Sequence, residues 1–341
     1  MTTATPVHSV PADAFDPAPV QRVAAAAAEA DGVEPLDEAA LLELRHHGLA
    51  DGALWVAGSA AEPDGSVGQP AGSASQPDGF AWVHGGAVDL VVAPATRGRG
   101  VGAALADAVA AELPGVALTA WSHGNHPAAA RLAERLGWER VRDLWVMRRP
   151  LTDLPPLDDA AQKARGAGIA VRAFRPGQDE EAFLALNAEA FAHHPEQGRM
   201  TREDLDRRMA EPWFDAAGFF VAERAGAGDA AAGGGERPAG GAPEGGPGGA
   251  GGLLGFHWTK VHDGDPPVGE VYVVGVSPGA QGTGLGRLLT LTGLHHLAGL
   301  GLDEVLLYVE SDNAAGVATY SGLGFTHAPE DTHVMYRSPS A

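Results

Sequence analysis

The sequence predicts two α/β domains in tandem, and three observations support this. The chain of 341 residues is longer than one hydrophobic core usually spans, and two domains would hold about 150 to 170 residues each. A glycine-rich hexapeptide occurs once in each half, as Arg-Gly-Arg-Gly-Val-Gly at 97–102 and as Gln-Gly-Thr-Gly-Leu-Gly at 281–286. Strand-like, turn-like and helix-like segments follow one another in the same order around both copies, which indicates an internal duplication.

The first half contains short apolar runs and two helical patterns. A helix should follow the hexapeptide, because Val101, Leu105 and Val109 recur at the spacing of a buried helical stripe. A second helix should begin after Asn125 and end at Gly137, since glycine is common just beyond a helix C-terminus. The strands expected in this half are 54–57, 80–84, 88–92 and 116–121.

The second half repeats this order. A leucine stripe at Leu285, Leu288 and Leu289 predicts a helix after the hexapeptide. Another helix should begin after Asn313 and end at Gly324. The strands expected here are 219–222, 253–261, 271–276 and 305–309, and the last is continuously apolar, as in a sheet covered on both faces.

A linker is expected between the two halves. Residues 151–168 contain two adjacent prolines and mixed charges but no periodic apolar pattern. We therefore predict an N-terminal domain at 1–150 and a C-terminal domain at 169–341.

Composition restricts the partners of the protein. The hydrophobic content of 45% is enough for two cores, and the formal net charge of −21 disfavours nucleic acid and anionic membranes as partners. A cationic small molecule, such as an amine, fits this charge better. The absence of cysteine excludes disulfides and thiolate metal sites and is compatible with a reducing cytoplasm.

The same composition leads to expectations about location and metals. No run of about 18 apolar residues and no signal peptide pattern occurs, so we expect a cytoplasmic protein, and we expect it to be a monomer. Adjacent histidines at 46–47, 193–194 and 295–296 would point about 100° apart on a helix and have no carboxylate at ligand spacing. We expect no metal.

The hexapeptides are candidate anion sites. A strand, a glycine turn and a helix start present free backbone N–H groups to an anion such as a pyrophosphate. A dinucleotide-binding fingerprint would lie near the start of a βαβ unit, and a Walker loop would continue with Gly-Lys-Ser/Thr. Here several strands precede each motif, and Arg287 and Leu288 follow Gly286, so neither alternative fits.

The order glycine motif, strand, Asn, helix and Leu-Gly-aromatic resembles the GNAT acetyltransferase family in both halves. The resemblance implies a mostly antiparallel mixed sheet flanked by helices, with acetyl-CoA as the acyl donor. It also implies that the pyrophosphate binds the hexapeptide amides and that pantetheine lies along the preceding strand. The implied acetyl-CoA ligands are Leu90, Val91, Val92, Gly98, Arg99, Gly100, Val101, Gly102 and Ala103 in the first half. In the second half they are Val274, Gly275, Val276, Gln281, Gly282, Thr283, Gly284, Leu285, Gly286, Arg287, Asn313, Ala314, Ala315, Gly316, Val317 and Ala318.

Longer runs in the second half make the resemblance more specific. The runs 194–198, 255–260, 269–276 and 308–313 resemble GNAT members that acetylate the cysteinyl amine of a cysteinyl-glucosaminyl-inositol. The first half matches less well, mainly at 31–33 and Glu38. The resemblance implies acetyl transfer to this small-molecule amine, and the implied substrate ligands are Glu38, Glu196, Lys260, Glu270 and Tyr308.

Two side chains of the second half suit the chemistry of aminolysis. An ammonium with a pKa of about 8 must lose a proton before it attacks a thioester, and Glu270 at a strand start is the candidate base. Period-2 alternation would put it on the face of Tyr272, Val274 and Val276. Tyr320 is the candidate proton donor to the leaving thiolate.

The equivalent positions of the first half are Gly86 and Ala133, so that domain is expected to bind acetyl-CoA without catalysis.

Each candidate site residue also has an interpretation without a functional role. Glu270 could be an ordinary carboxylate at a strand start, and Tyr308 and Tyr320 could serve in core packing alone. Glu38 could simply favour a helix start. Glu196 and Lys260 could be surface charges. Acetylation of another amine, such as a protein N-terminus or an aminoglycoside, and a non-catalytic acyl-CoA-binding module are the alternative functions.

Overall fold

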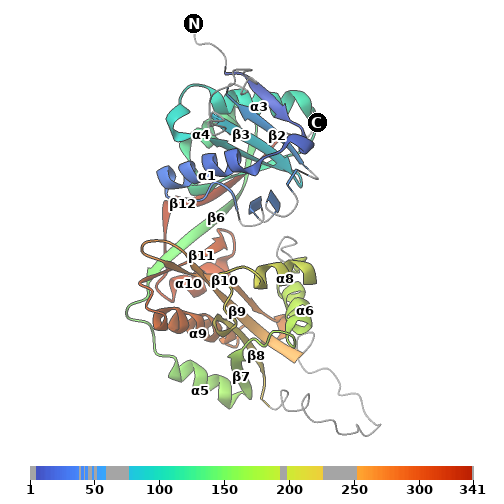
Figure 1. Ribbon diagram of the computed structural model, residues 1–341. Helices are drawn as coiled ribbons and strands as arrows, with labels where there is room; N and C mark the ends of the chain where they lie inside the picture. The colour runs from blue at the N-terminus through green and yellow to red at the C-terminus, as the bar shows by residue number, and fades with distance from the viewer. Residues whose placement is uncertain are drawn as a thin grey trace, which may run out of the picture. The chain divides into compact units, whose positions relative to one another are not determined.

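The computed structural model describes residues 5–37, 40–41, 43–44, 48–49, 52–58, 77–192, 198–225 and 252–339. These residues form two compact units, each a mixed β-sheet covered by helices, which confirms the predicted fold class (Figure 1). Within the described residues, unit 1 comprises Met1–Trp145, Glu310–Asp312 and Ala328–Ala341, and unit 2 comprises Val146–Val309 and Asn313–His327.

Unit 1 is built on a sheet with the strand order β1-β2-β3-β4-β5-β12, followed by β6. The strands β1 to β4 are antiparallel to one another, β4 and β5 are parallel, and β12 is antiparallel to β5. The strands are β1 (Val7–Val10), β2 (Gly52–Ala57), β3 (Gly79–His84), β4 (Ala87–Val92), β5 (Thr119–Ser122), β6 (Glu139–Pro150) and β12 (Thr326–Arg337). The helices are α1 (Pro17–Asp31), α3 (Val101–Glu112) and α4 (Pro127–Leu136).

Helices α1 and α3 cover opposite faces of this sheet (Figure 1). Because side chains alternate along a strand, Leu54 and Phe80 pack in the α1 cluster while their neighbours Trp55 and Ala81 pack in the α3 cluster. All four are nearly inaccessible to solvent. Burial of apolar surface on both faces therefore stabilises the sheet that carries the first hexapeptide.

Unit 2 repeats the plan with the strand order β6-β11-β10-β9-β8-β7. Strands β7 and β8, β8 and β9, and β9 and β10 pair antiparallel, whereas β10 and β11 pair parallel. The further strands are β7 (Ile169–Ala173), β8 (Phe219–Arg224), β9 (Leu253–His262), β10 (Val268–Val276) and β11 (Glu304–Glu310). The helices are α5 (Asp158–Gly166), α6 (Glu180–Ala190), α8 (Arg202–Met209), α9 (Leu285–Gly299) and α10 (Ala314–Ser321).

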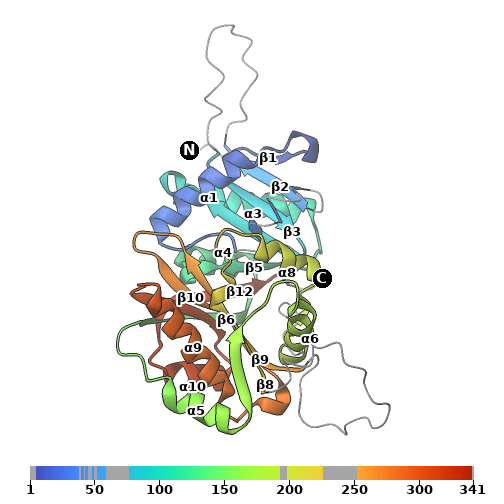
Figure 2. The same ribbon diagram turned by 60° about the horizontal axis from the view of Figure 1, so that its bottom comes forward.

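A separate hydrophobic cluster packs on each face of the sheet of unit 2. On one face, α6 and α8 cover an aromatic cluster that includes Phe183, Phe219 and Trp258, with the Phe219 and Trp258 rings stacked 4.6 Å apart. On the other face, α9 lies beside α5 (Figure 2). The leucines of α9 pack with residues of α5, and Leu289 is fully buried. The leucine stripe predicted for the helix after the second hexapeptide is thereby confirmed.

The structure confirms most predicted elements and corrects one. The strand predicted at 116–121 begins only at Thr119, because a turn closes between Leu113 and Val116, with Gly115 at a φ of 75°. Val116 is 46% exposed in consequence. Seven elements were not predicted from the sequence, namely β1, β6, β7, β12, α5, α6 and α8, and α5 lies inside the predicted linker.

Strands β6 and β12 each belong partly to both units. Residues 328–337 of β12 follow unit 2 in the chain but lie in unit 1, where Val334 and Tyr336 face Ser122 and Ala120 of β5. Ser338 continues this contact, since its backbone N–H donates to the carbonyl of Leu118. The limits 1–150 and 169–341 stay a prediction for the domains. The compact units are divided differently, because residues 328–337 belong to unit 1 and residues 146–150 belong to unit 2.

Candidate active site

Both hexapeptides form the same backbone turn at a helix start. Gly98 and Gly100 have φ values of 74° and 87°, and Gly282 and Gly284 have φ values of 75° and 90°. These values lie in the left-handed region that favours glycine. No side chain caps the described start of α3 or α9, so the first backbone N–H groups of each helix are left for an anion.

Strands β10 and β11 diverge beside the second turn. Their parallel pairing covers only 269–271 with 305–307. Beyond that point the pairings of the described residues join β10 to β9 alone. The outer edge of 274–276 therefore offers backbone groups to an extended ligand, as a pantetheine arm would be. In unit 1, β4 and β5 pair only at Ala87 and Thr119, so that edge is open as well.

A β-bulge at Tyr272 shows that the predicted side-chain alternation holds as far as Tyr272 and was wrong beyond it. The register with β9 shifts directly after Val271. Tyr272 and its successor both pack in the aromatic cluster beside α6, whereas Val276 packs beside α9. The extra residue of a bulge reverses the faces of the residues that follow it. Glu270 therefore does not share a face with Val276.

The carboxylate of Glu270 is buried where β10 and β11 still pair. The residue is 5% exposed, and its Oε2 atom lies 2.6 Å from Nε2 of His262 at the end of β9. Lys260 stands opposite Glu270 in the register of the two strands. A buried carboxylate next to the divergence of two strands is positioned to accept a proton from an amine that enters there.

Aromatic rings hold Lys260. Its Nζ atom lies 4.4 Å from the centre of the Trp213 ring and 5.2 Å from the centre of the Tyr272 ring. The Tyr272 hydroxyl in turn accepts a hydrogen bond of 3.0 Å from Arg208 Nε. These contacts restrict the direction of the ammonium group. Trp213 and Arg208 were not predicted from the sequence, because no sequence spacing relates residues 208–213 to β10.

Tyr308 and Tyr320 of unit 2 were predicted as a substrate ligand and as the proton donor. Tyr308, on β11, is 41% exposed and lies two residues beyond Leu306, the partner of Glu270 in the parallel pairing, so Tyr308 and Glu270 lie on the same face of the sheet. Desolvation of its hydroxyl and the charge of Glu270 raise the pKa of Tyr308. Burial raises the pKa of Tyr320, on α10, to about 12, and its ring meets Phe325 at a centroid distance of 5.9 Å. Both phenols stay protonated near neutral pH and can donate a proton. The structure brings Lys260, Glu270 and Tyr308 together.

The other predicted acetyl-CoA ligands of the second half lie on the turn before α9 and on the first turns of α10. Asn313 caps α10, where its Oδ1 atom accepts a hydrogen bond of 2.9 Å from the backbone N–H of Gly316. Gln281 Nε2 donates to the carbonyl of Val276 at 3.3 Å. The side chains of Asn313 and Gln281 thus shape the turns, while the backbone N–H groups remain the candidate anion ligands.

A cation near the second turn was also missed. The Nζ atom of Lys163, on α5, lies 4.0 Å from the position that a Cβ atom would take at Gly284. Lys163 falls within the predicted linker, where no motif points to it. A positive charge at this turn adds to the attraction of the helix N-terminus for phosphate.

In unit 1 an ion pair closes the first turn. The Arg97 guanidinium donates to both carboxylate oxygens of Asp31, at 2.6 and 2.7 Å. Its Nε atom donates to the carbonyl of Val92 at 3.3 Å, the contact that Gln281 makes in unit 2. The hydrogen bond from Arg97 holds the pKa of Asp31 below its usual range. Arg97 therefore supports the turn, with its charge neutralised by Asp31.

A cavity of about 790 Å³ lies beside this first turn. Its lining includes the strand residues 90–92 and the helix start 100–103, which were predicted to hold the first acetyl-CoA. Gly86, the equivalent of Glu270, lies in the turn between β3 and β4 with a φ of 81° and has no side chain to accept a proton.

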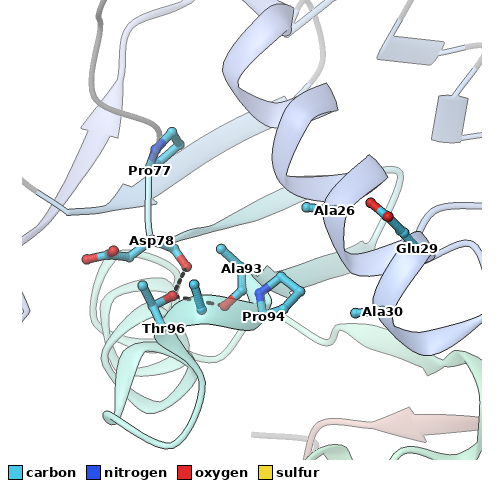
Figure 3. Close-up of a pocket in the computed structure, with 9 residues that line it drawn as sticks. Ala26, Glu29, Ala30, Pro77, Asp78, Ala93, Pro94 and Thr96 are labelled. Carbon is cyan, nitrogen blue, oxygen red and sulfur yellow. Dashed lines mark hydrogen bonds between the residues drawn. The ribbon is translucent and has the colours of Figure 1, made fainter.

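A second cavity of unit 1, of about 620 Å³, has the wrong charge for phosphate. Ala26, Glu29 and Ala30 of α1 face Asp78 and Thr96 across it (Figure 3). The Thr96 hydroxyl is used within the protein, because it donates to the carbonyls of Asp78 and Ala93. The described lining carries two carboxylates and no cationic side chain, which excludes it as an acetyl-CoA site.

The predicted substrate ligands Glu38 and Glu196 both lie outside the described residues. In the part of the chain that is described, no three histidine, aspartate or glutamate side chains are gathered as for a metal ion. No helix in those ranges has the length and apolar character needed to cross a bilayer.

Comparison with known proteins identifies the class of this site. The acetyltransferase (GNAT) family model matches residues 188–325, and an acetyltransferase (GNAT) domain model matches residues 50–140. The chain is therefore a tandem GNAT acetyltransferase.

Two solved structures share its fold. A GCN5-related N-acetyltransferase from Sphaerobacter thermophilus aligns with a TM-score of 0.58 at 23% identity, over 99% of this chain and 98% of that one. A tandem GNAT protein from the clavulanic acid biosynthesis pathway aligns with a TM-score of 0.62 at 18% identity, over 98% and 99%. At these identities the likeness concerns the fold.

Sequence relatives identify the family more narrowly. A mycothiol acetyltransferase from Nocardioides sp. is 50% identical over 330 residues, which cover 94% of this chain and 97% of the relative. Another from Thermobispora bispora is 46% identical over 344 residues, covering 99% and 100%. The chain belongs to the mycothiol acetyltransferase family, which confirms the specific resemblance of the second half.

Proposed function

We propose that this chain transfers the acetyl group of acetyl-CoA to the cysteinyl amine of a cysteinyl-glucosaminyl-inositol, and so forms mycothiol. The observation that carries this proposal is the buried carboxylate of Glu270 beside the divergence of β10 and β11, in a member of the mycothiol acetyltransferase family. The uncapped start of α9, with Lys163 nearby, would hold the pyrophosphate of acetyl-CoA.

The proposed reaction needs one proton acceptor and one proton donor. Glu270 takes a proton from the substrate ammonium, and the free amine attacks the thioester carbon. The tetrahedral intermediate then breaks its carbon–sulfur bond, and Tyr320 gives its proton to the leaving thiolate. Lys260 and Tyr308, which lie beside Glu270, would bind the polar groups of the acceptor, together with the predicted ligands Glu38 and Glu196.

We further propose that unit 1 binds acetyl-CoA without catalysing transfer. The cavity beside Gly100 supports binding, and the lack of a side chain at Gly86 argues against catalysis. Cytoplasmic location and a monomeric state remain predictions from the sequence.

Release of free CoA, followed with a thiol reagent, tests the function. The purified protein with acetyl-CoA is expected to release CoA when the cysteinyl-glucosaminyl-inositol is added and to release little without it. An aminoglycoside and a peptide with a free N-terminus serve as control acceptors. Equal rates with a control acceptor would assign the enzyme to another amine, and no release with any acceptor would favour the non-catalytic binding module.

Replacing Tyr320 with Phe is expected to lower kcat roughly tenfold to a hundredfold, because the thiolate loses its proton donor. Because burial raises the pKa of Tyr320 to about 12, the phenol stays protonated through pH 10, and the wild-type enzyme should keep this donor across that range. Initial rates of the wild type and the variant between pH 7 and 10 check both points. A variant with the wild-type kcat would remove Tyr320 as the acid.

A further inference from the structure

The carboxylate of Glu270 bonds a side chain that is itself exposed to solvent. Among the described residues, its side chain has a single hydrogen-bond partner, Nε2 of His262, at 2.6 Å. The Glu270 side chain is 7% exposed, whereas the His262 side chain is 38% exposed. A proton accepted by Glu270 therefore has little direct contact with water, and the imidazole connects the buried carboxylate to the outside.

The residues around this pair do not offer an equivalent route. Lys260, opposite on β9, is directed at the Trp213 and Tyr272 rings. Tyr308, on β11, has a raised pKa and holds its own proton at neutral pH. From α8, Arg208 stays protonated and is bound to the Tyr272 hydroxyl. Of these groups, His262 alone is in hydrogen-bond contact with the carboxylate, exposed to water, and able both to accept and to donate a proton through its two ring nitrogens.

We propose that His262 is a positioning and proton-relay residue, which passes the proton received by Glu270 to solvent after each acetyl transfer. This deepens the proposed function and depends on Glu270 being the base. In the relay, the neutral ring carries its proton on Nδ1, and the O–H bond at Glu270 breaks as an N–H bond forms at His262 Nε2. The Nδ1–H bond of the imidazolium then breaks as water accepts that proton, and proton exchange with water returns the remaining proton from Nε2 to Nδ1. The carboxylate is left ionised for the next substrate. No other reactant is needed.

Two substitutions separate positioning from relay. In His262→Gln the amide can still donate a hydrogen bond to Glu270 but cannot carry a proton, so the carboxylate keeps its place. In His262→Ala the ring is removed and leaves room for free imidazole beside Glu270. His295→Gln is the matched control, because His295 is a half-buried histidine of unit 2 that bonds the carbonyl of Pro155, and glutamine retains a donor there.

The acceptor-dependent assay is run on the full chain with and without imidazole. We expect both His262 variants to lose kcat by about tenfold to a hundredfold with an unchanged KM for acetyl-CoA, since acid–base steps act on turnover. Imidazole should restore much of the rate of His262→Ala and leave His295→Gln unaffected. Wild-type kcat in His262→Gln, or a loss in His262→Ala that imidazole does not change, would overturn the relay.

Glu270→Gln, assayed in parallel, separates this proposal from the one on which it depends. Loss of activity in Glu270→Gln together with normal His262 variants would reject the relay alone. Full activity in Glu270→Gln would reject the base and the relay together. Melting temperatures of all variants, expected within about 2 °C of the wild type, show that the losses are not due to unfolding.

Discussion

Replacing Glu270 with Gln is expected to lower kcat by about 100-fold to 10,000-fold, the usual contribution of a general base. Glutamine has the size of glutamate and can still hydrogen-bond His262, but it accepts no proton at neutral pH. The substrate ammonium would then lose its proton only to water. Steady-state kinetics with acetyl-CoA and the cysteinyl-glucosaminyl-inositol measure this effect.

The control for Glu270→Gln is the same exchange at a surface carboxylate of unit 2. Glu181, on α6, is 82% exposed in its side chain and bonds only to exposed Arg202 among the described residues. Glu181→Gln should leave kcat and KM at wild-type values, because an exposed ion pair contributes little. Wild-type turnover in Glu270→Gln would show that another group deprotonates the amine.

Replacing Gly293 with Ala is expected to destabilise unit 2 by about 3 kcal/mol or more, the upper part of the range for overpacked cores. Gly293 lies in α9, and a Cβ atom there would overlap the ring of His257 on β9. This ring is fully buried and fixed by a hydrogen bond of 2.7 Å between Nδ1 and the carbonyl of Leu289. Burial also lowers the pKa of His257 to about 4, so the ring is neutral and has no charge to draw it toward solvent.

Thermal unfolding checks the effect of Gly293→Ala. A loss of about 3 kcal/mol should lower the Tm by roughly 6 to 12 °C. Gly299→Ala is the matched control, since Gly299 lies in the same helix and a Cβ atom added there would meet no described atom within 4 Å. Alanine there should stabilise the helix slightly, because glycine is a poor helix former. An unchanged Tm in Gly293→Ala would mean that His257 moves aside without cost.

Local patterns gave the parts of the fold that depend on near neighbours in the chain. The glycines at 282 and 284 were correctly assigned to a turn before a helix, because only a residue without a Cβ atom adopts these φ values freely. The leucine stripe from Leu285 followed from helical periodicity. The missed strands β6 and β12 are twelve residues long but half-exposed or charged over much of their length, so neither alternation nor a continuous apolar run marked them.

In the candidate site, too, the sequence predicted features that depend on near neighbours in the chain and did not predict contacts between strands. Glu270 was found because it precedes a recognisable strand, and the register opposite Lys260 agrees with the hairpin of β9 and β10. The bulge at Tyr272 was not foreseen, since a bulge depends on the partner strand as well as on the local sequence. His262 was overlooked because its importance comes from a contact across the hairpin with Glu270, eight residues along the chain.

The sequence by itself determined the duplicated α/β plan, the two glycine turns and the asymmetry between Glu270 and Gly86, because each is written in the identity and spacing of neighbouring residues. Tertiary structure alone decided that the end of β12 joins unit 1 and that Trp213 and Arg208 lie with Lys260 and Tyr272. These contacts join segments far apart in the chain. Their formation depends on the total burial and pairing of whole strands and helices, which no local pattern encodes.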